Sequence, residues 1–84
     1  MKRAECISNI GKFVFHIEQF GDGSAQINTG LITHLMLNDE DENKPKSVMV
    51  HLSSYNCLVS NIGIYSSRYE AEWLCRFYGL DVIS

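Results

Sequence analysis

Histidine is the residue type in this chain of 84 residues that would most readily bind a metal ion. His16, His34 and His51 each fall in a segment where apolar and polar residues alternate, so each is expected on a β-strand. Imidazoles on adjacent strands can bind zinc together. The three histidines are, however, 18 and 17 residues apart, and these spacings match no local zinc motif. We therefore predict no metal ligands and no cofactor.

The cysteines do not suggest redox or nucleophilic chemistry. Cys6, Cys57 and Cys75 are odd in number and far apart, and no two of them form a Cys-x-x-Cys pair. In a reducing compartment this pattern favours cysteines that pack as small apolar residues. The sequence also lacks a Gly-x-Ser-x-Gly motif and a glycine-rich phosphate loop. We therefore predict no catalytic residue and no enzymatic activity.

Near the C-terminus, a set of aromatic residues is better suited to binding than to catalysis. Tyr69, Trp73 and Phe77 recur every fourth residue, so on a helix they form one stripe, with Glu72 and Arg76 beside it. Trp and Tyr are among the side chains that most often anchor protein interfaces. Two alternatives stay open: either the first residues or the tail of the chain cover this stripe, or it binds a partner.

A run of acidic residues is the second candidate for binding. Asp39, Glu40, Asp41 and Glu42 hold four of the ten acidic residues of the chain. Such a run often does no more than keep a loop hydrated. Alternatively, it steers the chain onto a basic surface, such as the nucleic-acid-binding groove of another protein.

The overall composition limits the class of partner and the location. A net charge of -3 and a pI near 5.4 argue against direct binding to nucleic acid. No apolar run approaches the ~20 residues that a membrane-spanning helix needs. Lys2 and Arg3 resemble the start of a signal peptide, but polar residues interrupt the apolar segment that should follow. We expect a cytoplasmic chain that forms a single domain over residues 1–84.

The apolar alternation predicts an antiparallel sheet of about four strands. The expected strands span 12–20, 24–37, 47–53 and 57–65, with a polar connection over 38–46. The first two strands are joined by a turn at Gly21-Asp22-Gly23, and Gly30 is expected to mark a bulge or bend. In the fourth strand, Leu58, Ile62 and Ile64 should face one side. Residues 1–11 fit either a strand or an irregular leader.

One helix is expected after the strands. Ser67 and Glu70 form a Ser-x-x-Glu capping box, and Gly79 is placed for a left-handed cap after Arg76 or Tyr78. The face expected to pack on one side of the sheet comprises Ala71, Leu74, Cys75 and Tyr78. On the surface, Glu72 and Arg76 form an i,i+4 pair. After the helix, Leu80 and the last apolar residues should fold back on the core. The predicted fold class is therefore α+β.

This layout resembles a class of small phage-encoded inhibitors that includes anti-CRISPR proteins. The residues that carry the resemblance are the Gly21-Asp22-Gly23-Ser24 turn, the acidic loop, and the passage from Ser66-Ser67 into Tyr69-Glu70-Ala71-Glu72-Trp73-Leu74. The resemblance implies a cytoplasmic, non-enzymatic protein that blocks a host defence or regulatory complex by occupying its surface. The acidic and aromatic residues would be its contacts.

Three hypotheses follow in order of preference. The first is an inhibitor or adaptor that binds another protein through Tyr69, Trp73 and Phe77, with the acidic run as steering charge. The second is an obligate homodimer in which the aromatic stripe is self-complementary. The third is a small metal protein or enzyme that uses its histidines or a cysteine.

Overall fold

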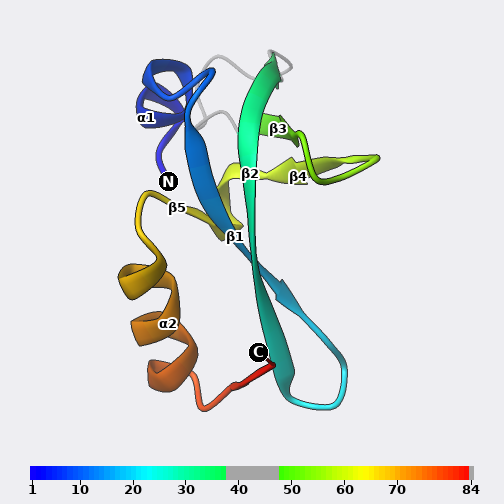
Figure 1. The fold of residues 1–84 in the computed structure, drawn as a ribbon, viewed down its shortest axis with the longest axis vertical. Coiled ribbons are helices and arrows are strands. Elements are labelled where there is room, and N and C mark those ends of the chain that lie inside the picture. The colour runs from blue at the N-terminus through cyan, green and yellow to red at the C-terminus, as the bar shows by residue number, and fades with distance from the viewer. Residues whose placement is uncertain (38–47, 84) are drawn as a thin grey trace, which may run out of the picture.

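A long central strand organises the computed structural model, which describes residues 1–37 and 48–83. The elements, in chain order, are α1 (Arg3–Ser8), β1 (Phe13–Gln19), β2 (Ser24–Leu37), β3 (Val48–Leu52), β4 (Leu58–Ser60), the 3₁₀ turn η1 (Asn61–Gly63), β5 (Ile64–Tyr65), α2 (Arg68–Phe77) and β6 (Asp81–Ile83). The strand order is β4-β3-β2-β1-β5, and β6 pairs in parallel with β2 (Figure 1).

Strand β2 is long enough to serve two parts of the sheet. Its first half pairs with β1 and β6, and its second half pairs with β3. The register shifts between Ile32 and His34, so a bulge separates the two halves. Gly30 itself pairs regularly with Val14, and a Cβ there would lie 2.6 Å from Ser54 Oγ. Gly30 is therefore a point of close approach, and the bend that was expected there lies at the bulge.

Two apolar clusters lie on opposite faces of the β1–β2 ribbon. The upper cluster, toward α1, comprises Cys6, Val14, Ile32, Val48, Val50, Leu52 and Ile64. The lower cluster, toward α2, comprises Ala25, Ile27, Ala71 and Cys75, with Phe15, Ile17, Tyr65 and Leu80 packed against it. Successive strand residues point to opposite faces, so Val14 and Phe15 enter different clusters. The single sheet thus supports one core on each face, the upper one toward α1 and the lower one toward α2.

Helix α2 begins and ends as the sequence predicts. The Ser67 hydroxyl accepts a hydrogen bond from the Glu70 amide at 3.1 Å. At the other end, Gly79 adopts φ 70°, and the Leu80 amide donates to the Cys75 carbonyl at 2.8 Å. These bonds satisfy backbone groups that a helix leaves without partners at its ends. Neither α2 nor any other helix within residues 1–37 and 48–83 has the length and apolar character needed to cross a membrane.

The α+β class, the antiparallel sheet and the C-terminal helix on one of its faces are confirmed, and three details differ. The first residues form a short helix, α1, whose Cys6 is buried, so neither alternative proposed for them holds. The expected fourth strand is split by η1, which turns Ile62 outward to 75% exposure. The tail adds a parallel strand to the sheet. Each difference depends on pairing between distant segments, which the local alternation of apolar and polar residues does not predict.

Candidate functional site: an exposed aromatic face on the C-terminal helix

The inner face of α2 packs against the sheet. Ala71 and Cys75 have no exposed surface, and Leu74 is half-buried. Tyr78, which was expected on this face, is 67% exposed. The chain turns at Gly79 directly after it, so Leu80 packs against the lower cluster in its place.

The outer side of α2 and the C-cap residue that follows it carry four large aromatic side chains, which we call the aromatic face: Tyr69, Trp73, Phe77 and Tyr78. Their exposed fractions are 76%, 52%, 68% and 67%, respectively. The Trp73 and Phe77 rings stack with centroids 5.5 Å apart and an interplanar angle of 16°, and Phe77 meets Tyr78 edge-on at 5.3 Å. The predicted stripe is thus real and extends by one residue. Tyr78 escaped the sequence analysis because helical projection assigns it to the inner side.

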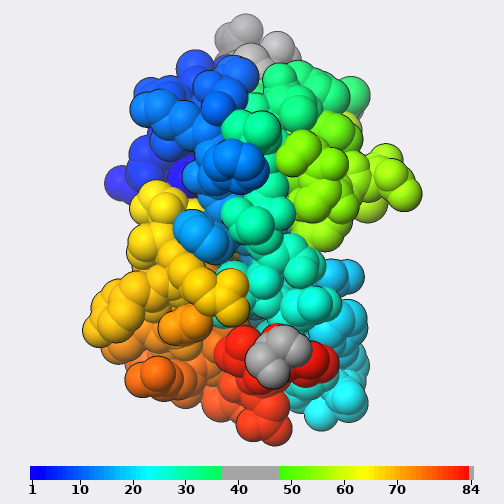
Figure 2. Space-filling view, in the orientation of Figure 1, coloured from blue at the N-terminus to red at the C-terminus, as the bar shows by residue number. Residues whose placement is uncertain are grey.

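Over the residues that the structure describes, the two ends of the chain do not cover this face. Helix α1 packs into the upper cluster through Cys6, and β6 is hydrogen-bonded along β2. Figure 2 shows the first residues (dark blue) above most of α2 (yellow to orange) rather than over it. The alternative in which the first residues or the tail cover the stripe is therefore wrong.

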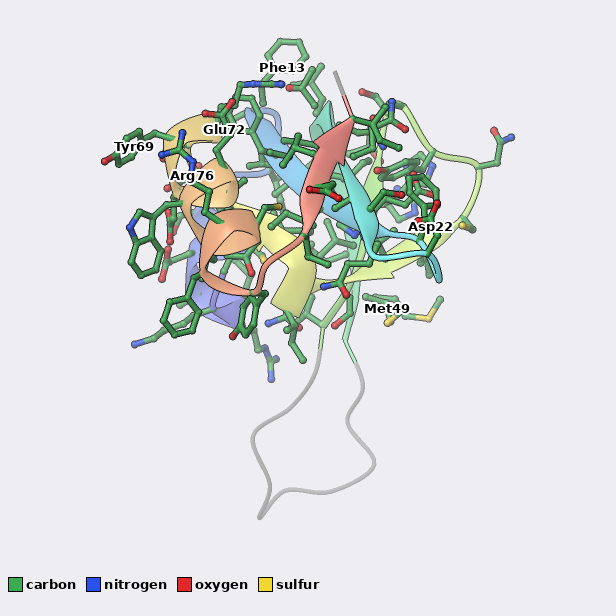
Figure 3. The ribbon with its side chains drawn as sticks, turned by 90° about the horizontal axis from the view of Figure 1, so that it is seen from below. Phe13, Asp22, Met49, Tyr69, Glu72 and Arg76 are labelled. Atoms are coloured by element: carbon green, nitrogen blue, oxygen red, sulfur yellow. The ribbon has the colours of Figure 1, made fainter. Side chains whose placement is uncertain are left out.

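Charged side chains flank the aromatic face. Arg68 Nε donates to Glu72 Oε1 at 3.0 Å, across one turn of the helix. The predicted partner of Glu72 was Arg76, but among the described residues its ion pair is with Arg68. Glu72 has i±4 neighbours on both sides, and spacing does not distinguish them. Viewed from below, Tyr69 and Arg76 both project outward from α2 (Figure 3). The half-exposed Arg68–Glu72 pair adds little stability. Its charges are therefore available to a partner.

The acidic run Asp39, Glu40, Asp41 and Glu42 lies outside the described residues. The strand ends that flank it, at the close of β2 and the start of β3, lie at the end of the molecule away from α2 (Figure 1). The structure therefore brings together five of the predicted contact residues, Tyr69, Glu72, Trp73, Arg76 and Phe77, on one helix.

A pocket of about 210 Å³ adjoins the aromatic face between α2, β1 and η1. Its lining includes Ile62, Tyr65, Leu74, Cys75 and Tyr78. Burial raises the pKa of Cys75, with a smaller contribution from Glu72. Burial likewise raises the pKa of Cys6. Both thiols are therefore held in the neutral form, which is a poor nucleophile.

The three histidines do not meet at one site. His16 Nδ1 lies 2.9 Å from the Tyr55 hydroxyl, which accepts a hydrogen bond from Asn28 at 2.8 Å. Asn28 also donates to Glu18 at 3.1 Å. Burial lowers the pKa of His16, against a smaller opposing effect of Glu18. His34 and His51 stack on each other elsewhere, and the part of the chain that the structure describes contains no group of three or more His, Cys, Asp or Glu placed to hold a metal.

No protein-family model, no curated protein and no solved structure matches this chain. The surface chemistry of the chain itself is therefore what bears on its function.

Proposed function

We propose that this chain is a non-enzymatic protein-binding module that docks the aromatic face of α2 onto another protein. Following the resemblance to phage-encoded inhibitors, it would block a host defence or regulatory complex in the cytoplasm by occupying a surface of that complex. The observation that carries the proposal is the exposure of Tyr69, Trp73 and Phe77 on one side of α2, whose other side is packed on the sheet, with Tyr78 exposed at its C-cap.

Burying such a face on a partner releases substantial free energy. Removal of apolar surface from water contributes about 25 cal/mol per Å², and Phe, Tyr and Trp bury roughly 150–250 Å² each. The Trp73–Phe77 stack is already formed in the free chain. Aromatic side chains have two χ angles, so fixing them on binding costs little conformational entropy. The face is therefore both apolar and preorganised.

The charge of the chain defines the kind of partner. The net charge is -3, and four carboxylates are concentrated at positions 39–42. A complementary partner would present an apolar groove for the aromatic face and, separately, basic residues for the acidic run, as the surface of a nucleic-acid-binding complex could. Opposite charge would mainly increase the association rate, and added salt should reduce that rate.

Capture of a tagged chain from its host tests the proposal when paired with a Trp73→Ala variant. A stoichiometric partner that binds the parent chain and is lost from the folded Trp73→Ala variant would support it. The matched control is Phe13→Ala, which removes another exposed aromatic side chain from β1, outside the aromatic face. If Phe13→Ala loses the partner equally, or if Trp73→Ala keeps it, the aromatic face is not the docking surface.

A homodimer is the second candidate, and the charge pattern of α2 favours it. If two α2 helices crossed antiparallel about a twofold axis at Trp73, Tyr69 would face Phe77 of the second copy. Glu70 would then face Arg76 of the second copy, giving two opposite-charge pairs around an aromatic centre. Sedimentation at increasing concentration separates the candidates. A dimer disrupted by Trp73→Ala would assign the face to self-association and overturn the inhibitor proposal.

A further inference from the structure

The outer face of the β2–β3 pair carries two histidines and two methionines in adjacent rungs of the sheet. His34 pairs with His51, and Met36 pairs with Met49. Directly opposed residues share a face of the sheet, as do residues two apart along a strand. All four side chains therefore lie on one face, while Val48 and Val50 lie in the upper cluster on the other. Met36 is 59% exposed, so a dissolved ion can reach it.

These four side chains are close enough to converge on one ion. Opposed Cβ atoms in an antiparallel pair are about 4.5–5.5 Å apart, and rungs two residues apart are separated by roughly 6.6–6.8 Å. The His34 and His51 rings already stack, with centroids 4.8 Å apart and planes inclined by 12°. A metal ion binds an imidazole nitrogen in the plane of the ring, so one of the stacked rings must turn about its side-chain bonds for both Nε2 atoms to reach one ion. Methionine has three rotatable bonds, so its thioether can adjust to an ion held there.

Thr33, at the bulge, orients both imidazoles. Its Oγ1 lies 3.0 Å from His34 Nδ1 and 2.5 Å from His51 Nδ1, and it can donate its proton to the His51 carbonyl at 3.3 Å. When it does so, both Nδ1–H groups donate to Thr33 Oγ1, and both Nε2 atoms carry free lone pairs. A histidine that binds a metal commonly donates its other ring N–H to an oxygen in this way.

We propose that His34, His51, Met36 and Met49 form a binding site for a soft monovalent metal ion, Cu(I). Thioether sulfur favours soft ions, and imidazole binds copper well, so the combination selects copper rather than calcium or magnesium. All four ligands are neutral, which suits an ion of single charge. Met49 lies on a different side of the molecule from Tyr69 (Figure 3), so this site is separate from the aromatic face.

Silver(I) titration followed by NMR tests the site without redox chemistry. The chain would carry Cys57→Ser, because Cys57 is exposed and a thiolate competes strongly for soft ions, whereas Cys6 and Cys75 are fully buried. Labelled methionine methyl groups give one signal each. Met1 packs against the upper cluster and is the internal control. We expect the Met36 and Met49 signals and the imidazole signals of His34 and His51 to shift together and saturate at one equivalent, while Met1 stays unchanged.

Two variants sharpen the result. Met36→Leu with Met49→Leu keeps the apolar shape and should abolish saturation at one equivalent. Thr33→Val removes the orienting hydroxyl and should weaken Ag(I) binding about tenfold without removing a ligand. His16→Gln, away from the site, should bind as the parent does. The proposal is overturned if the methionine signals do not move, if binding disappears with Cys57, or if the double leucine variant binds Ag(I) as tightly as its parent.

Discussion

The two apolar clusters of this small fold differ in what fills them. The upper cluster contains most of the large, fully buried side chains, including Ile32, Leu52 and Ile64. The fully buried residues of the lower cluster are small, namely Ala25, Ala71 and Cys75, and the large aromatic side chains of α2 lie outside it. The upper half therefore buries the largest core side chains, although Ile7, Ile10 and Met36 remain exposed there. The lower half fully buries only small side chains and leaves the aromatic face of α2 exposed.

The strongest test of this contrast is a cavity in the upper cluster. Leu52 has no exposed surface, and Leu52→Ala should lower the free energy of unfolding by about 2–5 kcal/mol through lost burial and the remaining cavity. Urea denaturation measures the change. A loss below about 1 kcal/mol is well under the usual range for this substitution. Such a small loss would show that the upper cluster does not dominate stability.

Overpacking the lower cluster should destabilise the lower half of the molecule selectively. Ala71 is fully buried between α2 and the sheet, and Ala71→Leu should cost about 1–3 kcal/mol because the added carbons must displace packed neighbours. We expect hydrogen exchange to accelerate in α2 and β6 more than in β3. Equal acceleration in all three elements would mean that the two clusters unfold as one unit.

The polar cluster at His16 should make stability depend on pH. Burial lowers the pKa of His16 in the folded chain below its usual 6.5, so the unfolded chain binds the proton more readily. Stability is therefore complete above pH 6.5 and falls as the pH drops from 6.5 toward the lowered value. Asp22, whose pKa is lowered mainly by a hydrogen bond from the Ser24 side chain, titrates in a more acidic range.

Urea unfolding at pH 7.5 and at pH 5.5 measures this effect, with His16→Gln as the control. Glutamine retains an acceptor for the Tyr55 hydroxyl but does not titrate. The variant should lose much of the pH dependence between these two values. An unchanged dependence would show that His16 is not its source.

The parts of the fold that the sequence predicts are those encoded by neighbouring residues. The Ser67 N-cap, the left-handed Gly79 and the strands β1 and β2 all rest on local signals, and the structure confirms them. The parallel strand β6 and the split around η1 depend on distant pairing, so alternation gives no sign of them.

The candidate site shows the same division. The spacing of Tyr69, Trp73 and Phe77 predicts a stripe, but its exposure depends on where α1 and β6 pack. The inclusion of Tyr78 depends on the turn at Gly79. Likewise, the pairing of Met36 with Met49 beside His34 and His51 depends on the register across a bulge, which the sequence does not reveal.

Binding of the captured partner to Trp73→Ala is the most direct test of docking through the aromatic face. Trp73 lies at the middle of the aromatic face and half of its surface is exposed, so the variant should remain folded, within about 0.5 kcal/mol of the parent chain. A central aromatic anchor typically costs 2 kcal/mol or more on truncation, so calorimetry should show Kd rising by roughly thirtyfold. A folded Trp73→Ala chain with unchanged Kd would show that the aromatic face is not the docking surface. A variant that loses as much stability as Leu52→Ala would show that Trp73 serves folding instead.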